Sequence, residues 1–350
     1  MSSSTGTIFR VTTFGESHGA ALGAVVDGVP AGLKIDMAFL QQHMNRRRPG
    51  TSKFVSPRKE PDKLEILSGV DSQCVTLGTP LTLIVRNTDV HSEDYASLRN
   101  TYRPGHADFT YHKKYGVAPQ PGGGRSSGRE TLARVAAGTI ARLILGEQVK
   151  IFSYCTAISG VVAKVTDIPF AEMHPLRFAD PALAAKAEQA VLAANKEGNS
   201  VGGIIELLIC GVPAGLGEPV FEKLDAALAG AVMSIGAVKG IEFGAGFRFP
   251  EMTGQQANDQ MSPDGFESNN AGGIIGGIST GQNIIMRLAV KPTPSIAVPQ
   301  KSITFDGKAA TVTTTGRHDP CVAPRVAIVA EAMAAIVLAD ALLCQKTRIL

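Results

Sequence analysis

The chain has 350 residues, of which 44% are hydrophobic and 19% are charged. This length allows one large domain or two smaller ones, and the composition excludes a disordered or coiled-coil protein. The formal net charge of +3 is uneven, because the first 150 residues carry a balance of +6 and the remaining 200 carry −3. Tryptophan is absent and aromatic residues make up 5%, which argues against a base-stacking platform for single-stranded nucleic acid.

Targeting and redox features favour a cytoplasmic protein. Residues 1–6 are small and polar, without the apolar core of a secretory signal. No uncharged apolar run approaches the 18 residues of a membrane span. The five cysteines are scattered and form no Cys-x-x-Cys pair, so we expect reduced thiols and neither disulfides nor structural zinc.

The N-terminal part of the chain predicts a β-hairpin followed by a helix. Apolar runs rich in β-branched residues at 8–14 and 22–26 are typical of strands. Asp36 can cap a helix over 37–47, and the arginines at 46–48 complement its dipole before Pro49 ends it.

Residues 15–19 match Gly-x-Ser-x-Gly, the nucleophile motif of many serine hydrolases. That motif needs a strand before it and a helix after it. The following residues 20–26 are short, interrupted by glycine and β-branched, so we expect a hairpin here. The same pattern at 124–128 precedes a helix, but the preceding residues 120–123 cannot form a strand. A serine hydrolase is therefore disfavoured at both places.

Basic residues gather in two stretches. Between Arg46 and Lys59 six basic residues meet no acidic one, and from Arg99 to Arg142 eight basic residues meet two acidic ones. The forked donors of arginine suit phosphate and carboxylate groups. A solvated face is the alternative, but the interleaved Gly, Ser and His residues favour an anion-binding site.

The segment 122–129, Gly-Gly-Gly-Arg-Ser-Ser-Gly-Arg, leads into a predicted helix over 130–145. Free backbone N–H groups, hydroxyls and guanidiniums at a helix N-terminus can bind an anion. No Gly-Lys-Ser/Thr follows, so this is not a Walker loop. A simple surface turn remains the alternative.

A repeat divides the chain. Gly-Val-Pro-Ala-Gly-Leu occurs at 28–33 and again at 211–216, each time after a strand-like run and before a helical pattern. Farther along, each copy is followed by a Gly- or Arg-rich loop and a long Ala-rich helix, 130–145 in one case and 325–343 in the other. We expect two similar halves, roughly 8–150 and 200–345, although chance can produce such a match in a Gly-rich chain.

Between these halves lies a segment near 165–200 that carries no convincing chemistry. It contains a predicted helix over 182–197, and Gly198 is a suitable C-cap. We expect this segment to be peripheral.

Three of the seven histidines, His18, His106 and His318, lie in Gly- or Arg-rich turns. No metal-binding spacing such as His-Glu-x-x-His is present, so acid and base roles are favoured over metal ligation. The other four histidines lack a partner in the sequence and are expected to be structural.

Several motifs together resemble those of the chorismate synthase family. They are GESHG at 15–19, GVP at 28–30, RRRPG at 46–50, RPGHAD at 103–108, GRSSGRET at 124–131, SNNAGG at 268–273, KPTPS at 291–295, RHDPC at 317–321 and EAM at 331–333. They span almost the whole chain, so the resemblance does not rest on one motif.

The resemblance implies an α/β (α+β) fold, a β-α-β sandwich with two pseudo-symmetric halves in a single 1–350 domain, assembled as a cytoplasmic homotetramer. It implies a lyase that converts 5-enolpyruvylshikimate 3-phosphate to chorismate and phosphate by anti-1,4-elimination, the last common step of the shikimate pathway. The departing hydrogen lies on a carbon that no carbonyl acidifies, and reduced FMN is thought to lend an electron transiently. Such a site needs many cations to hold a multiply anionic substrate.

The resemblance also implies roles for individual residues. His18 matches the histidine that protonates the departing phosphate, His106 the one beside the reduced flavin, and Asp319 the carboxylate of a proton relay. Both histidines are expected to carry a charge readily in an anion-rich pocket. Substrate binding maps to Ser17, Arg47, Lys53, Arg103, Arg129 and Arg317. Flavin binding maps to Arg125, Ser126, Ser127, Gly236, Ala237, Gly276, Lys291, Pro292, Thr293, Pro294 and Ser295, with Arg317 shared.

Two positions depart from the family pattern. Lys53 stands where many relatives have Arg, so a point charge replaces a fork. Gly236 stands where Asn is common, which removes a side-chain hydrogen bond to the flavin. Both departures concern affinity more than activity.

Two other functions stay open from the sequence alone. One is an NADPH-dependent flavin reductase, and the other is a module that binds RNA or a phosphorylated ligand. Few aromatic residues and the carboxylate near Arg317 argue against the second. NADPH is a possible reductant for the flavin, but no dinucleotide fingerprint is present, which favours external supply of reduced flavin. The expected partners are small molecules and further copies of the chain.

Overall fold

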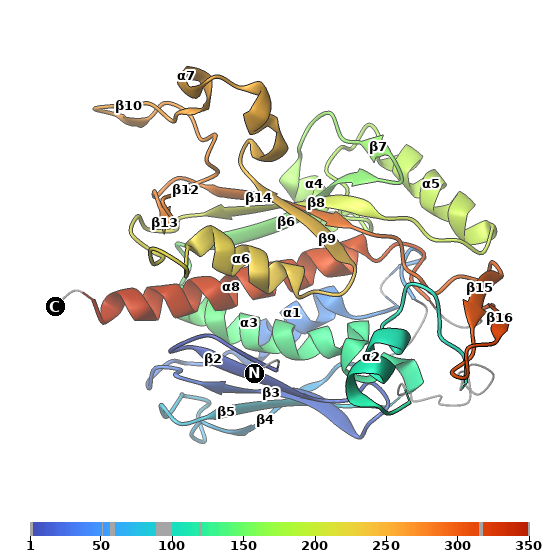
Figure 1. Ribbon diagram of the computed structural model, residues 1–350. Helices are drawn as coiled ribbons and strands as arrows, with labels where there is room; N and C mark the ends of the chain where they lie inside the picture. Colours follow the sequence, from blue (N-terminus) through green and yellow to red (C-terminus); the bar gives the residue numbers. More distant parts are fainter. Residues whose placement is uncertain are drawn as a thin grey trace.

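A computed structural model describes residues 3–50, 52–56, 60–88, 100–118, 121–314 and 318–348. Two five-stranded antiparallel sheets form its outer layers, and four helices lie between them (Figure 1). The first sheet has the order β1 (Ser4–Thr5), β2 (Arg10–Gly15), β3 (Ala21–Asp27), β5 (Leu81–Arg86) and β4 (Leu64–Ser68). The second has the order β7 (Val161–Val162), β6 (Lys150–Ile158), β8 (Gly203–Cys210), β14 (Ile284–Val290) and β9 (Val238–Phe243). The mixed α and β sandwich expected from the sequence is confirmed.

The helical layer consists of α1 (Met37–Arg47), α3 (Thr131–Leu145), α6 (Leu224–Met233) and α8 (Ala323–Lys346). Outside the layers lie α2 (Asp108–Tyr115), α4 (Ile168–Met173), α5 (Ala184–Lys196), α7 (Gly254–Ala257) and three short 3-10 helices, 121–126, 128–130 and 246–251. Three small hairpins complete the described chain: β10 (Met261–Ser262) with β11 (Gly265–Phe266), β12 (Ile274–Ile275) with β13 (Ile278–Ser279), and β15 (Gln300–Ile303) with β16 (Ala309–Val312).

The two main sheets are built in the same way. In each, two strands precede a helix, two further strands follow it, and a long helix comes last: β2, β3, α1, β4, β5 and α3, then β6, β8, α6, β9, β14 and α8. The spatial orders β2-β3-β5-β4 and β6-β8-β14-β9 correspond strand for strand. Two similar halves would produce this correspondence; the boundaries 8–150 and 200–345 stay a prediction.

Local sequence signals explain several elements. The Asp36 side chain accepts a hydrogen bond from the Ala38 N–H at 2.8 Å, as expected of the N-cap of α1. Residues 16–20 form the turn between the paired strands β2 and β3, so the predicted hairpin is confirmed. Helix α5 ends before Gly198, which has a φ of 69°. In β14 alternate residues are buried, which matches one face packed on the helices.

Small residues let α3 and α8 approach closely. A β-carbon built at Gly138 of α3 would lie 2.5 Å from the Ala332 Cβ of α8. Helix α8 is long and apolar enough to cross a membrane, but most of it is buried inside the protein, as is usual for a core helix.

One buried carboxylate ties α8 to its neighbours. Glu331 is 1% exposed and accepts hydrogen bonds from Arg46 of α1 at 2.7 Å, Arg142 of α3 at 2.8 Å and Ser153 of β6 at 2.6 Å. Burial opposes ionisation, but the neighbouring guanidiniums outweigh it and lower the pKa of Glu331 to about 2. This carboxylate therefore joins the helical layer to the second sheet.

We expect Gly138→Ala to reduce the free energy of unfolding by about 1–3 kcal/mol, because the added methyl group forces α3 and α8 apart. Urea denaturation measures this change. Gly230→Ala in α6 is the matched control, since no atom lies within 4 Å of its new Cβ, and it should gain up to about 1 kcal/mol. Equal stability of Gly138→Ala and the wild type would contradict the close helix contact.

Candidate active site

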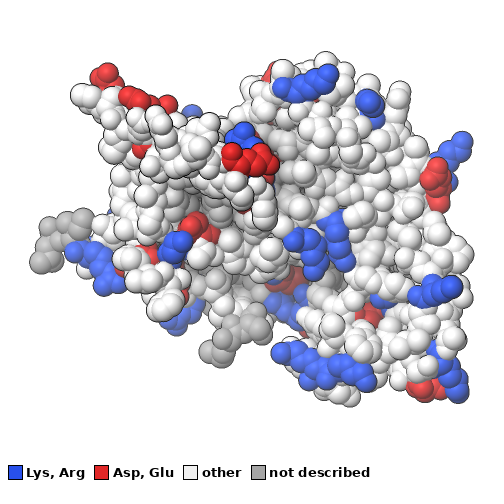
Figure 2. All heavy atoms as spheres, turned by 45° about the horizontal axis from the view of Figure 1, so that its top comes forward, with Lys and Arg blue, Asp and Glu red and all other residues white. Residues whose placement is uncertain are grey.

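A cavity of about 1050 Å³ is lined by residues from both the N-terminal and the C-terminal parts of the chain. Most of the residues that the sequence assigned to substrate, flavin or proton transfer line it: Arg103, His106, Arg125, Ser126, Ser127, Arg129, Gly236, Ala237, Lys291, Thr293, Pro294, Ser295 and Asp319. These residues come from segments that are far apart in the chain, from Arg103 to Asp319. Figure 2 shows Lys and Arg side chains gathered around a hollow near the centre of one face.

Ser17 and His18 lie directly behind the wall of the cavity. The Ser17 hydroxyl donates to the carbonyl of Gly122 at 3.4 Å. A β-carbon built at Gly122 would lie 2.5 Å from His18 Nε2. No residue larger than glycine therefore fits between this imidazole and the cavity. Gly122 lines the cavity and has a φ of 69°, which further favours glycine.

Three further predicted residues, Lys53, Gly276 and Pro292, do not line the cavity. Lys53 is exposed, and its Nζ lies 3.8 Å from a carboxylate oxygen of Glu188 in α5. Gly276 lies in the turn between β12 and β13 and does not line the cavity, and neither does Pro292. Arg317 lies outside the described residues.

Arg47 is fully buried behind Arg129, and it too is absent from the cavity lining. Asp62 lies between the two arginines, with Oδ2 2.5 Å from Arg47 Nη2 and Oδ1 3.0 Å from Arg129 Nη1. Burial lowers the pKa of Arg47 to about 10, against the opposing effect of Asp62. Arg129 also donates from Nε to the Asn87 side chain at 2.7 Å. The position of Arg47 therefore suits holding Asp62 and, through it, Arg129.

His106 has a defined tautomer. Its Nδ1 lies 3.0 Å from the Pro104 carbonyl, which can only accept, so Nδ1 carries the hydrogen. Nε2 then accepts from the Ser295 hydroxyl at 2.8 Å. Burial, with a smaller effect of the positive charge of Arg103, lowers the pKa of His106 to about 4. The expectation of a readily charged imidazole therefore does not hold for the protein without ligand, because burial prevails.

Arg103 and Asp319 are each fixed by an ion pair. Arg103 donates from Nε and Nη2 to the two carboxylate oxygens of Asp108, both at 2.7 Å. Asp319 accepts from the backbone N–H of Ser56 and from Nη1 of Arg325, also both at 2.7 Å. Arg325 lines the cavity, and no sequence pattern singled it out.

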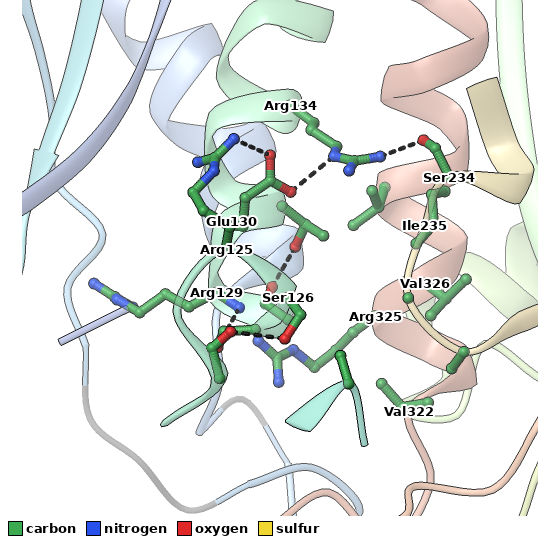
Figure 3. A pocket seen from close by; sticks show the side chains of 18 of the residues that line it. Arg125, Ser126, Arg129, Glu130, Arg134, Ser234, Ile235, Val322, Arg325 and Val326 are labelled. Carbon is green, nitrogen blue, oxygen red and sulfur yellow. Dashed lines mark hydrogen bonds and ion pairs between the residues drawn. The ribbon is translucent and has the colours of Figure 1, made fainter. Parts of the chain in front are cut away.

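Glu130 is a second residue of the cavity that no sequence pattern indicated. It is 4% exposed, accepts from the Thr13 hydroxyl at 2.9 Å, and forms ion pairs with Arg125 at 3.4 Å and Arg134 at 2.9 Å (Figure 3). Arg134 also donates to Ser234 Oγ at 2.6 Å. An acidic residue at the start of a helix gave no signal of such contacts.

The Gly-rich loop before α3 adopts a backbone that favours glycine. Gly122, Gly123 and Gly124 all have positive φ, at 69°, 88° and 50°. The Ser127 side chain then accepts from the Arg129 N–H at 3.3 Å and caps the turn that leads into α3. This loop and the neighbouring guanidiniums line the same cavity, so an anion can reach both.

The cavity also suits a planar cofactor with polar edges. Thr293 Oγ1 is buried, lines the cavity and has no hydrogen-bond partner among the described residues. No atom lies within 4 Å of a β-carbon built at Gly236. The unpaired hydroxyl of Thr293 can bond to a polar atom at the edge of a flavin ring. The free space beside Gly236 can accommodate the flat face of the ring.

The sandwich and its cationic cavity together define an enzyme that acts on a small anionic molecule. The family model described as chorismate synthase matches residues 9–343. A solved structure titled "Crystal Structure of Chorismate Synthase" is 31% identical, covers 97% of this chain and 93% of its own, and superposes with a TM-score of 0.77. The chain belongs to the chorismate synthase family.

Family membership settles the class of reaction. The protein is a lyase of the shikimate pathway that forms chorismate from a small-molecule substrate, and the family implies a requirement for reduced flavin. The alternatives of a flavin reductase or an RNA-binding module lose their support.

We expect NMR titration of ligand-free protein to show a midpoint near pH 4 for His106, because burial and Arg103 disfavour its protonated form. His106→Asn identifies the resonance by its loss. The imidazole should thus stay neutral between pH 6 and 8 until an anion binds beside it. A midpoint near about 6.5, the ordinary value for histidine, would contradict this environment.

Proposed function

We propose that the cavity binds 5-enolpyruvylshikimate 3-phosphate and reduced FMN side by side and forms chorismate and phosphate by anti-1,4-elimination. The observation that carries this proposal is the convergence of Arg103, His106, Arg129 and Asp319 on one cavity. Reduced flavin would supply the transient electron that lets phosphate leave without net oxidation. The active form is a cytoplasmic homotetramer.

The substrate anions would bind to guanidiniums that are already fixed. Arg103 and Arg129 line the cavity and are oriented by Asp108 and Asp62. Ser17 and His18 lie one glycine away, so a phosphate near Gly122 would place His18 to protonate the leaving group. Arg47 acts through Asp62. Lys53 and Arg317 are proposed to complete this set when substrate is bound.

The flavin would occupy the side of the cavity formed by Arg125, Ser126 and Ser127, by Gly236 and Ala237, and by Lys291 and 293–295. Pro292, Gly276 and Arg317 are further proposed contacts. The neutral Nε2 of His106, hydrogen-bonded to Ser295, would lie at the edge of the flavin and hold or pass a proton. Asp319, fixed by Ser56 and Arg325, would accept the proton in the relay.

The source of reduced flavin is tested by the same assay as the reaction. Anaerobic incubation of the protein with dithionite-reduced FMN and the enolpyruvyl substrate should produce chorismate, followed by its absorbance, together with equimolar phosphate. We propose external supply of reduced flavin, so oxidised FMN with NADPH should give no product. Lasting oxidation of NADPH without the substrate would instead indicate a flavin reductase.

We expect His106→Ala and Asp319→Asn each to slow turnover by about a hundredfold or more, which is the scale of lost general acid–base catalysis. Folding and FMN affinity should remain nearly unchanged, because neither substitution removes a residue of the helical core. Steady-state turnover under anaerobic conditions measures the effect, and FMN titration provides the control. Turnover close to that of the wild type in both variants would remove these roles.

A further inference from the structure

Arg134 connects two parts of the cavity wall that belong to different halves of the chain. Its side chain leaves the first turn of α3, and Nε lies 2.9 Å from Glu130 Oε2 while Nη1 lies 2.6 Å from Ser234 Oγ (Figure 3). Ser234 is the C-cap of α6 and donates its own hydroxyl hydrogen to the Ala231 carbonyl at 2.6 Å. One guanidinium therefore links α3 to the end of α6.

The turn after Ser234 contains a residue with a strained backbone. Ala237 has a φ of 76°, a left-handed conformation that costs about 1–2 kcal/mol for a residue other than glycine. Its carbonyl accepts a hydrogen bond from the Lys291 N–H at 2.9 Å. The turn thus lies between α6 and the segment 291–295, and both the turn and that segment belong to the proposed flavin site.

The other end of the connection also reaches the proposed flavin site. Glu130 accepts from Arg134 through one oxygen and contacts Arg125 and the Thr13 hydroxyl through the other. Arg125, in turn, donates to the Thr13 hydroxyl at 2.5 Å and to the Gly15 carbonyl at 3.2 Å. A continuous chain of contacts therefore runs from Arg125 through Glu130 and Arg134 to Ser234.

We propose that Arg134 is a positioning residue for the flavin, and this inference rests on the proposed function. Its guanidinium sets the separation between Arg125 and the turn 234–237, two parts of the cavity wall that would both hold the flavin. Two donors in fixed directions are needed, one for Glu130 and one for Ser234, and the planar fork of arginine provides both. The ammonium of a lysine is a point charge and does not reproduce this arrangement.

The test is a double-mutant cycle with FMN affinity as the readout. Arg134→Met and Ser234→Ala should each raise the dissociation constant of oxidised FMN by about tenfold, the size of one lost hydrogen bond to a charged group. The double variant should be no weaker than Arg134→Met alone, because both substitutions remove the same contact. Arg134→Lys should also bind weakly. Quenching of flavin fluorescence on titration measures each constant.

Arg86→Met is the matched control. Arg86 lies at the end of β5, does not line the cavity, and forms an exposed ion pair with Glu65 at 3.2 Å. Its loss should leave FMN affinity unchanged. Urea denaturation of the ligand-free variants separates loss of stability, which lowers the unfolding midpoint alone, from loss of positioning, which weakens FMN binding to folded protein. If Arg134→Met does not fold, Ser234→Ala and Arg134→Lys carry the comparison.

The outcomes are distinguishable. Wild-type FMN affinity in both Arg134→Met and Ser234→Ala overturns the positioning role and leaves the proposed function intact. Independent losses that add in the double variant overturn the connection between the two residues. If the wild type shows no saturable FMN binding, both the proposed function and this inference are overturned.

Discussion

Buried carboxylates hold the arginines of the cavity in place, and the site depends on this constraint. Asp108 holds Arg103, Asp62 holds Arg129, and Glu130 holds Arg125 and Arg134, whereas the pair of Asp319 with Arg325 is only half-buried. Breaking a buried pair by removing one partner commonly costs about 3–5 kcal/mol, because the other charge is left uncompensated. The guanidiniums are therefore oriented before any ligand binds, and an incoming anion meets donors that need little rearrangement.

Buried carboxylates also hold the two neighbouring arginines at the end of α1, and they hold them in different directions. Arg46 extends toward Glu331 of α8, whereas Arg47 extends toward Asp62. Each pair anchors the end of α1 in a different direction, one toward the second sheet and one toward the cavity. The end of α1 is thus fixed from both sides, and Arg325 adds a third contact by donating from Nε to the carbonyl of Arg47 at 3.2 Å.

Local features could be predicted from the sequence, but the choice of ion-pair partners could not. The cap at Asp36, the hairpin around 15–19 and the positive φ of Gly122 follow from short-range rules. That Arg129 faces the cavity while Arg47 lies behind it depends on Asp62, whose position comes from the folding of the intervening chain. The ion pair of Lys53 with Glu188 could not be predicted either, because the segment that contains Glu188 carries no chemical signal of its own.

The first turns of two long helices line the cavity and favour the binding of anions there. The helices α3 and α8 each come last in the matching series of strands and helices, and residues of their first turns, Thr131 and Val326 among them, line the same cavity. A helix N-terminus carries a partial positive charge and free N–H groups. Both helices thus direct their positive ends toward one space, although the loops that precede them differ. The Gly-Arg-Ser loop before α3 supplies hydrogen-bond donors, and the segment before α8 supplies the carboxylate of Asp319, which pairs with Arg325. Two helices in corresponding positions thus bring different chemical groups to one cavity.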